Sequence, residues 1–117
     1  PLACAAAMAT LEIYEEEGLF TRGRELDDHW MDNALRLKGE PNVIDVRSMG
    51  FIGAIELAPR PGAPGDRGIE AGRAAYEKGV WLRNIGDALV LSPPLIISRD
   101  EITRIFDTIV EVVRNTP

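Results

Sequence analysis

The hydrophobic and polar positions along this chain predict two helices within its first 38 residues. Residues 2–17 are rich in alanine, the strongest helix former, and they are apolar on nearly every side as far as Ala9. We therefore expect the start of this helix to be buried. Gly18 separates it from a second helix over 19–38, which Gly39 ends. The second helix carries a single apolar stripe, formed by Leu19, Gly23, Leu26, Trp30, Ala34 and Leu37.

Short apolar runs separated by turn residues predict two pairs of strands with a helix between them. Gly50 supplies the backbone freedom for a tight turn within the first pair. Prolines and glycines over 59–68 predict an irregular surface loop. The expected elements are strands at 42–48 and 51–58, a helix at 69–78, and strands at 80–83 and 88–91.

The last helix has the clearest sequence signals. Ser98 and Glu101 have the spacing of a capping box, and a regular apolar face follows. The resulting order α-α-β-β-α-β-β-α predicts an α+β fold, in which helices pack on a mainly antiparallel sheet of about four strands. The length favours a single domain over 1–117. We expect its core to include Leu26, Trp30, Ile44, Ile55, Leu82, Val90, Ile105 and Ile109.

Composition excludes several classes of function. The chain has 13 basic and 19 acidic residues, a net charge of −6. Nucleic acids and anionic membrane surfaces bind basic proteins, so neither is an expected partner. Cys4 is the only cysteine. No internal disulfide can form, which is typical of a reducing compartment such as the cytoplasm.

Few residues have the pattern of a reactive site. His29 and Cys4 alone cannot make a zinc site, and no metal site is expected. His29 lies on a charged helix, where we expect it to be solvated or paired with an aspartate. Arg83 ends the strand expected at 80–83, and a planar guanidinium held there suits a carboxylate ligand. A surface ion pair with Asp87 is the alternative for Arg83.

Several short motifs follow one another in a recognisable order along the chain. They are the apolar run at 1–11, the hairpin at 43–57 that ends in Glu-Leu, the run at 55–65, and the strand pair Gly79–Arg83, Gly86–Asp87 and Leu91–Leu95. Together, over all 117 residues, their order resembles that of class III aminotransferases, in particular the ω-amino acid:pyruvate (β-alanine:pyruvate) branch.

The resemblance implies part of a fold-type I enzyme that uses pyridoxal 5'-phosphate, works as a homodimer, and exchanges an amino group between amines or amino acids and keto acids. It also implies that the lysine holding the cofactor is absent from this chain. Neither Lys38 nor Lys78 has the matching context, so no catalytic or cofactor-binding residue is expected here. Arg83 matches the family arginine that binds the substrate carboxylate.

The alternative to an enzyme fragment is a free-standing α+β ligand-binding or dimerisation module without catalysis. Because the chain enters an apolar helix directly after Pro1, we expect it to be part of a longer protein and to be inactive alone.

Overall fold

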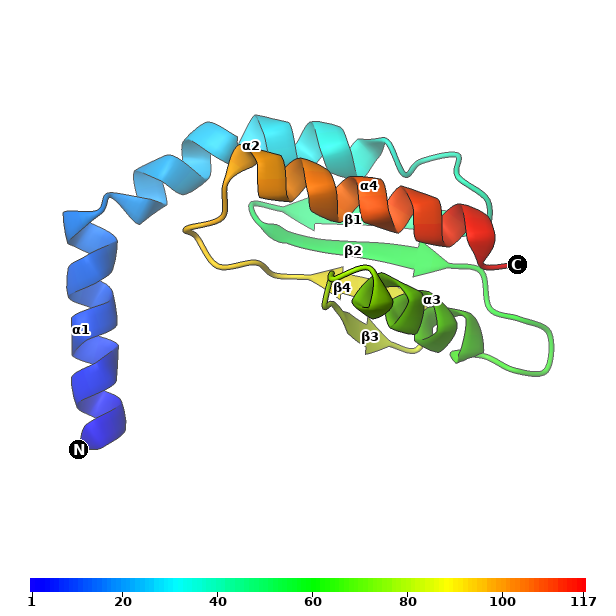
Figure 1. The fold of residues 1–117 in the computed structure, drawn as a ribbon, viewed down its shortest axis with the longest axis horizontal. Coiled ribbons are helices and arrows are strands. Elements are labelled where there is room, and N and C mark those ends of the chain that lie inside the picture. Colours follow the sequence, from blue (N-terminus) through cyan, green and yellow to red (C-terminus); the bar gives the residue numbers. More distant parts are fainter.

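The computed structural model describes residues 1–117, which form four helices and four strands (Figure 1). All strand pairs are antiparallel, and the sheet order is β1-β2-β4-β3. The expected α+β fold with a four-stranded antiparallel sheet is confirmed. The elements are α1 (Leu2–Glu16), α2 (Leu19–Leu35), β1 (Val43–Met49), β2 (Ile52–Leu57), α3 (Asp66–Glu77), β3 (Arg83–Ile85), β4 (Ala88–Leu91) and α4 (Arg99–Asn115).

Helices α2, α3 and α4 pack together on one face of the sheet and enclose the core there (Figure 1). Trp30 on α2 is fully buried at its centre. The Trp30 ring lies 4.9 Å from the ring of Phe106 on α4 and 5.5 Å from that of Phe51, measured between centroids. The apolar stripe of α2 therefore meets both a neighbouring helix and the sheet.

Most of the expected core residues lie in this core. Ile44 and Val90 do not, and for them the prediction was wrong. Ile44 is 62% exposed, because it lies at a β-bulge next to Val43, and Val43 takes the inward position. Val90 is only half-buried, since its neighbours on β4 point into the core and strand residues alternate between faces. The confirmed positions are Trp30, Ile55, Leu82 and Ile109, which are buried, and Leu26 and Ile105, which pack against the core in part.

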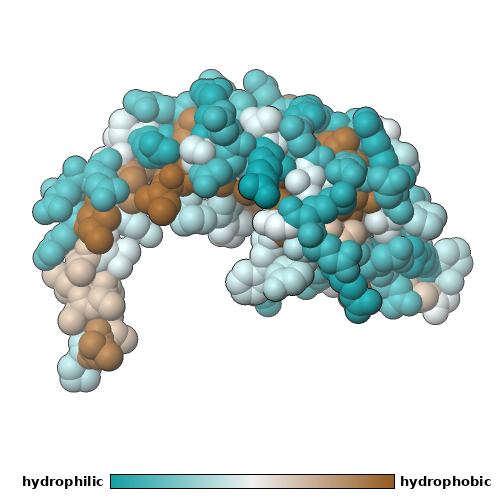
Figure 2. All heavy atoms as spheres, in the orientation of Figure 1, coloured by the Kyte–Doolittle hydropathy of each residue, from teal (hydrophilic) through white to brown (hydrophobic).

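The predicted burial of the first helix is wrong for this chain. Helix α1 extends away from the other elements as an arm and has no buried residue (Figure 1). Its apolar side chains, including Leu2 at 86% exposure, lie on the surface (Figure 2). An edge-to-face contact between Tyr14 and Phe20 joins α1 to α2 at a ring distance of 5.3 Å. The alanine-rich sequence forms the helix, but no element of these 117 residues covers it.

The third strand also differs from the prediction, since β3 begins at Arg83, where the predicted strand ended. The Val80 amide donates to the Ala75 carbonyl at 2.9 Å, so the segment before Arg83 is tied to the end of α3. Leu82 still points into the core. Apolar alternation at 80–83 therefore reflects burial beneath the helices and not pairing in the sheet.

The capping box of α4 is confirmed, and it predicts an acid-sensitive contribution to stability. Glu101 accepts hydrogen bonds from the Ser98 amide and the Ser98 hydroxyl, and these lower the pKa of the Glu101 carboxyl below its usual value of 4.5. Because the folded-state pKa of Glu101 is lowered, the ionised carboxylate stabilises the folded chain above about pH 4.5. This stabilisation is lost as the pH falls through the folded-state pKa. Glu101→Gln should flatten this acid limb of stability against pH, as measured by urea unfolding from pH 7 to pH 3. An unchanged acid limb would contradict the assignment.

Candidate functional site

Arg83 is the first residue of β3, at the edge of the sheet. The next residue, Asn84, faces the helices, since its side-chain amide donates to the Gly68 carbonyl on α3. Side chains alternate along a strand, so Arg83 points to the opposite face. That face carries no helix, and we call it the open face. Its residues are Asp45, Arg47, Met49, Ile52, Ala54, Glu56, Arg83, Ile85, Ala88 and Val90.

The expected alternative for Arg83, an ion pair with Asp87, does not form. The Asp87 carboxylate is buried and accepts hydrogen bonds from the amides of Gly65 and Gly68, at 2.7 and 3.0 Å. It thus caps the start of α3, which begins at Asp66 instead of the predicted residue 69. Arg83 is exposed and takes part in none of the six ion pairs of the chain.

Helix α3 approaches the turn between β3 and β4 closely, and this contact fixes the end of the short strand that Arg83 begins. A Cβ added at Gly68 would lie 2.8 Å from the Asp87 Cα and would also overlap the Gly86 carbonyl. These are backbone atoms, which cannot move away independently. This contact was not predicted, although the sequence holds two signals for it: Gly68 has no side chain, and Asp87 has a carboxylate that can cap a helix.

Gly68→Ala should therefore lower the free energy of unfolding by about 1–3 kcal/mol, the usual cost of overpacking. Gly23→Ala is the matched control, because Gly23 is also helical and an added Cβ would make only an ordinary contact, 3.5 Å from Leu95. The control should be neutral or up to about 1 kcal/mol more stable through helix propensity. Urea unfolding followed by circular dichroism measures both, and equal effects of the two changes would contradict the packing argument.

The other arginine of the open face, Arg47, is neutralised by carboxylates. Its guanidinium lies 2.9 Å from the Asp45 carboxylate and 2.8 Å from that of Glu56. The hydrogen bond to Glu56 is the main reason why the pKa of Arg47 is raised. The open face also exposes apolar side chains, including Met49 and Ile85. Arg83 is therefore the one arginine of this face that is free to bind an anion.

Neither lysine of the chain lies in a setting that would hold a cofactor. The Lys78 ammonium pairs with the Glu111 carboxylate at 2.8 Å, and Lys38 is exposed beyond the end of α2. The pyridoxal phosphate that the sequence resemblance implies would need a lysine beside a phosphate site. Neither Lys38 nor Lys78 fits that requirement.

His29 has a structural contact and does not form a second candidate site. The His29 ring nitrogen Nε2 lies 2.9 Å from the Thr103 hydroxyl and 3.2 Å from the Arg99 carbonyl, so His29 joins α2 to α4. We predicted that His29 would be solvated or paired with an aspartate; it is half-buried and its ring contacts Thr103 and Arg99, not an aspartate. No group of histidine, cysteine or acidic side chains could hold a metal ion. No helix has the length and hydrophobicity needed to cross a membrane.

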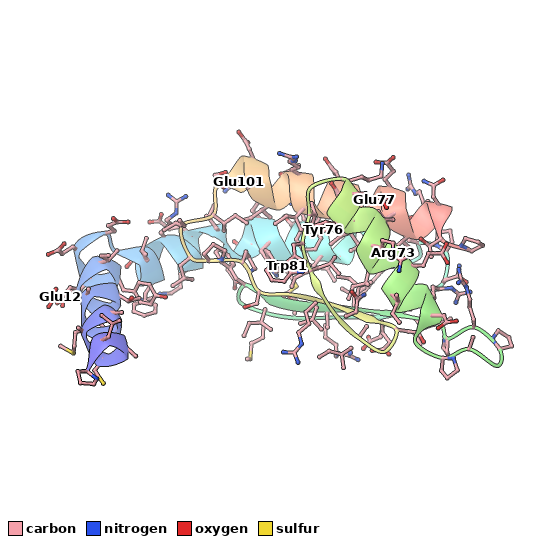
Figure 3. All side chains as sticks on the ribbon, turned by 60° about the horizontal axis from the view of Figure 1, so that its bottom comes forward. Glu12, Arg73, Tyr76, Glu77, Trp81 and Glu101 are labelled. Carbon is pink, nitrogen blue, oxygen red and sulfur yellow. The ribbon has the colours of Figure 1, made fainter.

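A cleft of about 550 Å³ lies elsewhere, between the segment before β3 and the start of α4. Its lining includes Trp81 and Glu101, both labelled in Figure 3. Arg83 does not line it, and the Glu101 carboxylate is already bound in the capping box. The cleft and the open face are therefore separate features.

Comparison with known proteins gives consistent matches over nearly the whole chain. Residues 1–113 match the family model described as aminotransferase class III. The chain is 45% identical to an omega-aminotransferase of Caulobacter vibrioides over 97% of its length, and 38% identical to a beta-alanine–pyruvate aminotransferase of Pseudomonas aeruginosa over the same share. These matches cover 26% and 25% of the two relatives, so the chain spans about a quarter of their length.

Solved structures give the same result for the fold. The chain superposes on a thermostable omega transaminase mutant from Pseudomonas jessenii with a TM-score of 0.92 and 30% identity, covering 100% of this chain and 27% of that one. An adenosylmethionine-8-amino-7-oxononanoate aminotransferase from Methanocaldococcus jannaschii matches with a TM-score of 0.88 and 33% identity, over 97% of this chain and 27% of that one.

Proposed function

The chain belongs to the class III aminotransferase family, and we propose that residues 1–117 are the C-terminal domain of a transaminase that moves an amino group from an ω-amino acid or amine to pyruvate or a similar keto acid. The names of these two relatives support the ω-amino acid and pyruvate chemistry. We further propose that the longer protein acts as a homodimer in the cytoplasm.

The observation that carries the role of this chain is the free guanidinium of Arg83 on the open face. Amino acid and keto acid substrates share a carboxylate, and a planar guanidinium binds a carboxylate through two parallel hydrogen bonds. Exposed apolar neighbours such as Ile85 would lower the access of water once another part of the protein covered this face. Arg83 would then orient the substrate by its acid group.

The cofactor belongs to the part of the protein outside these residues. Pyridoxal phosphate, when bound, acts as the electron sink for the bond changes at the substrate carbon. Residues of this chain contribute the recognition of the substrate and a rigid frame for it. Asn84 and Asp87 hold β3 against α3, and this fixes the position from which Arg83 extends.

The direct experiment is to purify the full-length protein with pyridoxal phosphate and to supply β-alanine and pyruvate. We expect alanine to form in step with loss of the donor amine. No alanine from any ω-amino acid or amine, in a preparation that binds the cofactor, would contradict the proposal.

A dimerisation module without catalysis is the remaining candidate, because α1 exposes its apolar surface (Figure 2). That function predicts self-association of the 117-residue chain without transamination by the full-length protein.

The isolated chain should not hold pyridoxal phosphate covalently, because neither Lys38 nor Lys78 lines the cleft of about 550 Å³, and the Lys78 ammonium is already paired with Glu111. After incubation with the cofactor and borohydride reduction, intact mass should show no stoichiometric adduct. Full modification of a single lysine, assigned to Lys38 or Lys78 by peptide mapping, would contradict this prediction.

A further inference from the structure

Four charged side chains belong to the open face, and three of them form one network. Arg47 on β1 bridges Asp45, two residues away on the same strand, and Glu56 on the neighbouring β2. The fourth, Arg83, lies on β3 at the other edge of the sheet. The two arginines and two carboxylates have no net charge together, yet the pairing is unequal, since Arg47 holds both carboxylates and Arg83 holds none.

The register places Arg83 and Arg47 in the same row of the sheet. Arg83 is opposite Val90 on β4, Val90 is opposite Ala54 on β2, and Ala54 is opposite Arg47 on β1. Because Glu56 is two residues beyond Ala54, its backbone is separated from that of Arg83 by two strand spacings sideways and two residues lengthwise. Standard sheet dimensions make this separation roughly 12 Å. Extended arginine and glutamate side chains together can bridge such a distance.

No polar side chain lies on the sheet between Arg83 and Glu56. Glu56 is opposite Ala88, and Arg83 is opposite Val90, so the surface between them carries no hydrogen-bonding side chain. The Glu56 side chain is 32% exposed and is therefore accessible from the open face. If the Glu56 carboxylate were released from Arg47, Arg83 would be the cation without a partner that shares the open face with Glu56.

We propose that Arg47 is a positioning residue, which holds the Glu56 carboxylate so that Arg83 remains free for the carboxylate of the substrate. This inference rests on the proposed function of Arg83. Without Arg47, Glu56 would compete with the substrate for the same guanidinium. An internal competitor lowers the apparent affinity by the fraction of molecules in which the site is free.

The test is steady-state kinetics of the full-length enzyme with two classes of substrate. One reaction uses β-alanine and pyruvate, which carry carboxylates, and the other uses a simple arylalkylamine and an aldehyde, which carry none. Arg47→Gln should raise KM for pyruvate about tenfold, as expected if Glu56 occupies Arg83 in nine molecules of ten, with little change in kcat. The KM values of the amine and the aldehyde should stay within about twofold, since neither uses Arg83.

Rescue by a second substitution separates this role from a purely structural one. Arg47→Gln/Glu56→Gln lacks the competing carboxylate and should restore KM for pyruvate to within about twofold of the wild-type value. Glu56→Gln alone should leave both reactions near wild type. If Arg47→Gln does not fold, Arg47→Lys replaces it, because a lysine holds Glu56 less firmly than a guanidinium fork does. It should give a smaller rise in KM for pyruvate that Glu56→Gln again removes.

Two results would overturn the inference. One is an equal loss for both substrate classes in the Arg47 variant, and the other is a selective loss that Glu56→Gln fails to restore. The Arg83→Ala variant, measured alongside, distinguishes this failure from a failure of the proposed function. A selective effect at Arg83 without one at Arg47 removes only the role of Arg47, whereas no selective effect at Arg83 removes the carboxylate site itself.

Discussion

Replacing Arg83 with alanine in the full-length enzyme should lower kcat/KM for keto acids and amino acids by about ten- to a hundred-fold and should spare simple amines. The reason is the charge of the substrate. A guanidinium on a fixed strand pairs with a carboxylate through two charge-assisted hydrogen bonds, whose loss costs about 1.5–3 kcal/mol. An amine without an acid group makes no such pair, so its reaction does not depend on Arg83.

Two further variants sharpen the Arg83 experiment. Arg83→Lys should restore activity only in part, because an ammonium group lacks the planar geometry of the guanidinium. Arg73→Ala is the matched control, since Arg73 is also exposed and free of ion pairs but lies on α3, on the helix side of the sheet (Figure 3). The control should leave both substrate classes unchanged. Equal losses for amines and amino acids in Arg83→Ala would indicate a role in folding, and Arg83 would no longer be a binding residue.

The positions predicted correctly from the sequence are those that local chemistry determines. The capping box at Ser98 and the apolar stripe through Trp30 lie as expected, because each depends on spacing within one helix. The strand at 88–91 also has its predicted bounds. Antiparallel pairing of β1 with β2 and of β3 with β4 followed from the short connections within each pair. The connection from β2 to β3 contains α3 and crosses over β4, so the pairing of β2 with β4 did not follow from loop length.

The incorrect predictions concern positions where tertiary contacts outweigh the local pattern. Val80 and Leu82 alternate as strand residues do, but the Val80 amide bonds to the end of α3. Ile44 has the composition of a core position, but a β-bulge turns it outward. Neither the bulge nor the helix contact can be predicted from the apolar pattern of the strand.

The candidate site was predictable only in part for the same reason. Arg83 could be selected as a candidate, because a planar guanidinium held at a strand end suits a carboxylate and because Arg83 matches the family arginine. Its pairing could not be predicted, since Asp87 is the nearest carboxylate in sequence, yet it caps α3 from a buried position. Which arginine of the open face is free depends on the sheet register, and the register becomes known only with the fold.

The second large effect that we expect is on stability, from Trp30→Ala in the 117-residue chain. The Trp30 side chain is 0% exposed and contacts aromatic rings from α4 and from the turn before β2. Its removal leaves a cavity that joins three elements, and none of them can close it without losing its other contacts. Substitutions of this kind cost about 3–5 kcal/mol, a large part of the 5–15 kcal/mol that stabilises a typical domain.

Trp81→Ala is the matched control for Trp30→Ala, because Trp81 is 87% exposed (Figure 3). An exposed side chain outside the core should change the free energy of unfolding by no more than about 0.5 kcal/mol. Urea unfolding should be followed by far-ultraviolet circular dichroism, since each variant loses a fluorescent tryptophan.

The indole of Trp30 also donates to the Ser48 hydroxyl at 3.0 Å, and Trp30→Phe removes this bond while it keeps most of the ring. Trp30→Phe should therefore lie between the wild type and Trp30→Ala. A Trp30→Ala variant as stable as Trp81→Ala would mean that the aromatic cluster does not hold α2 and α4 on the sheet.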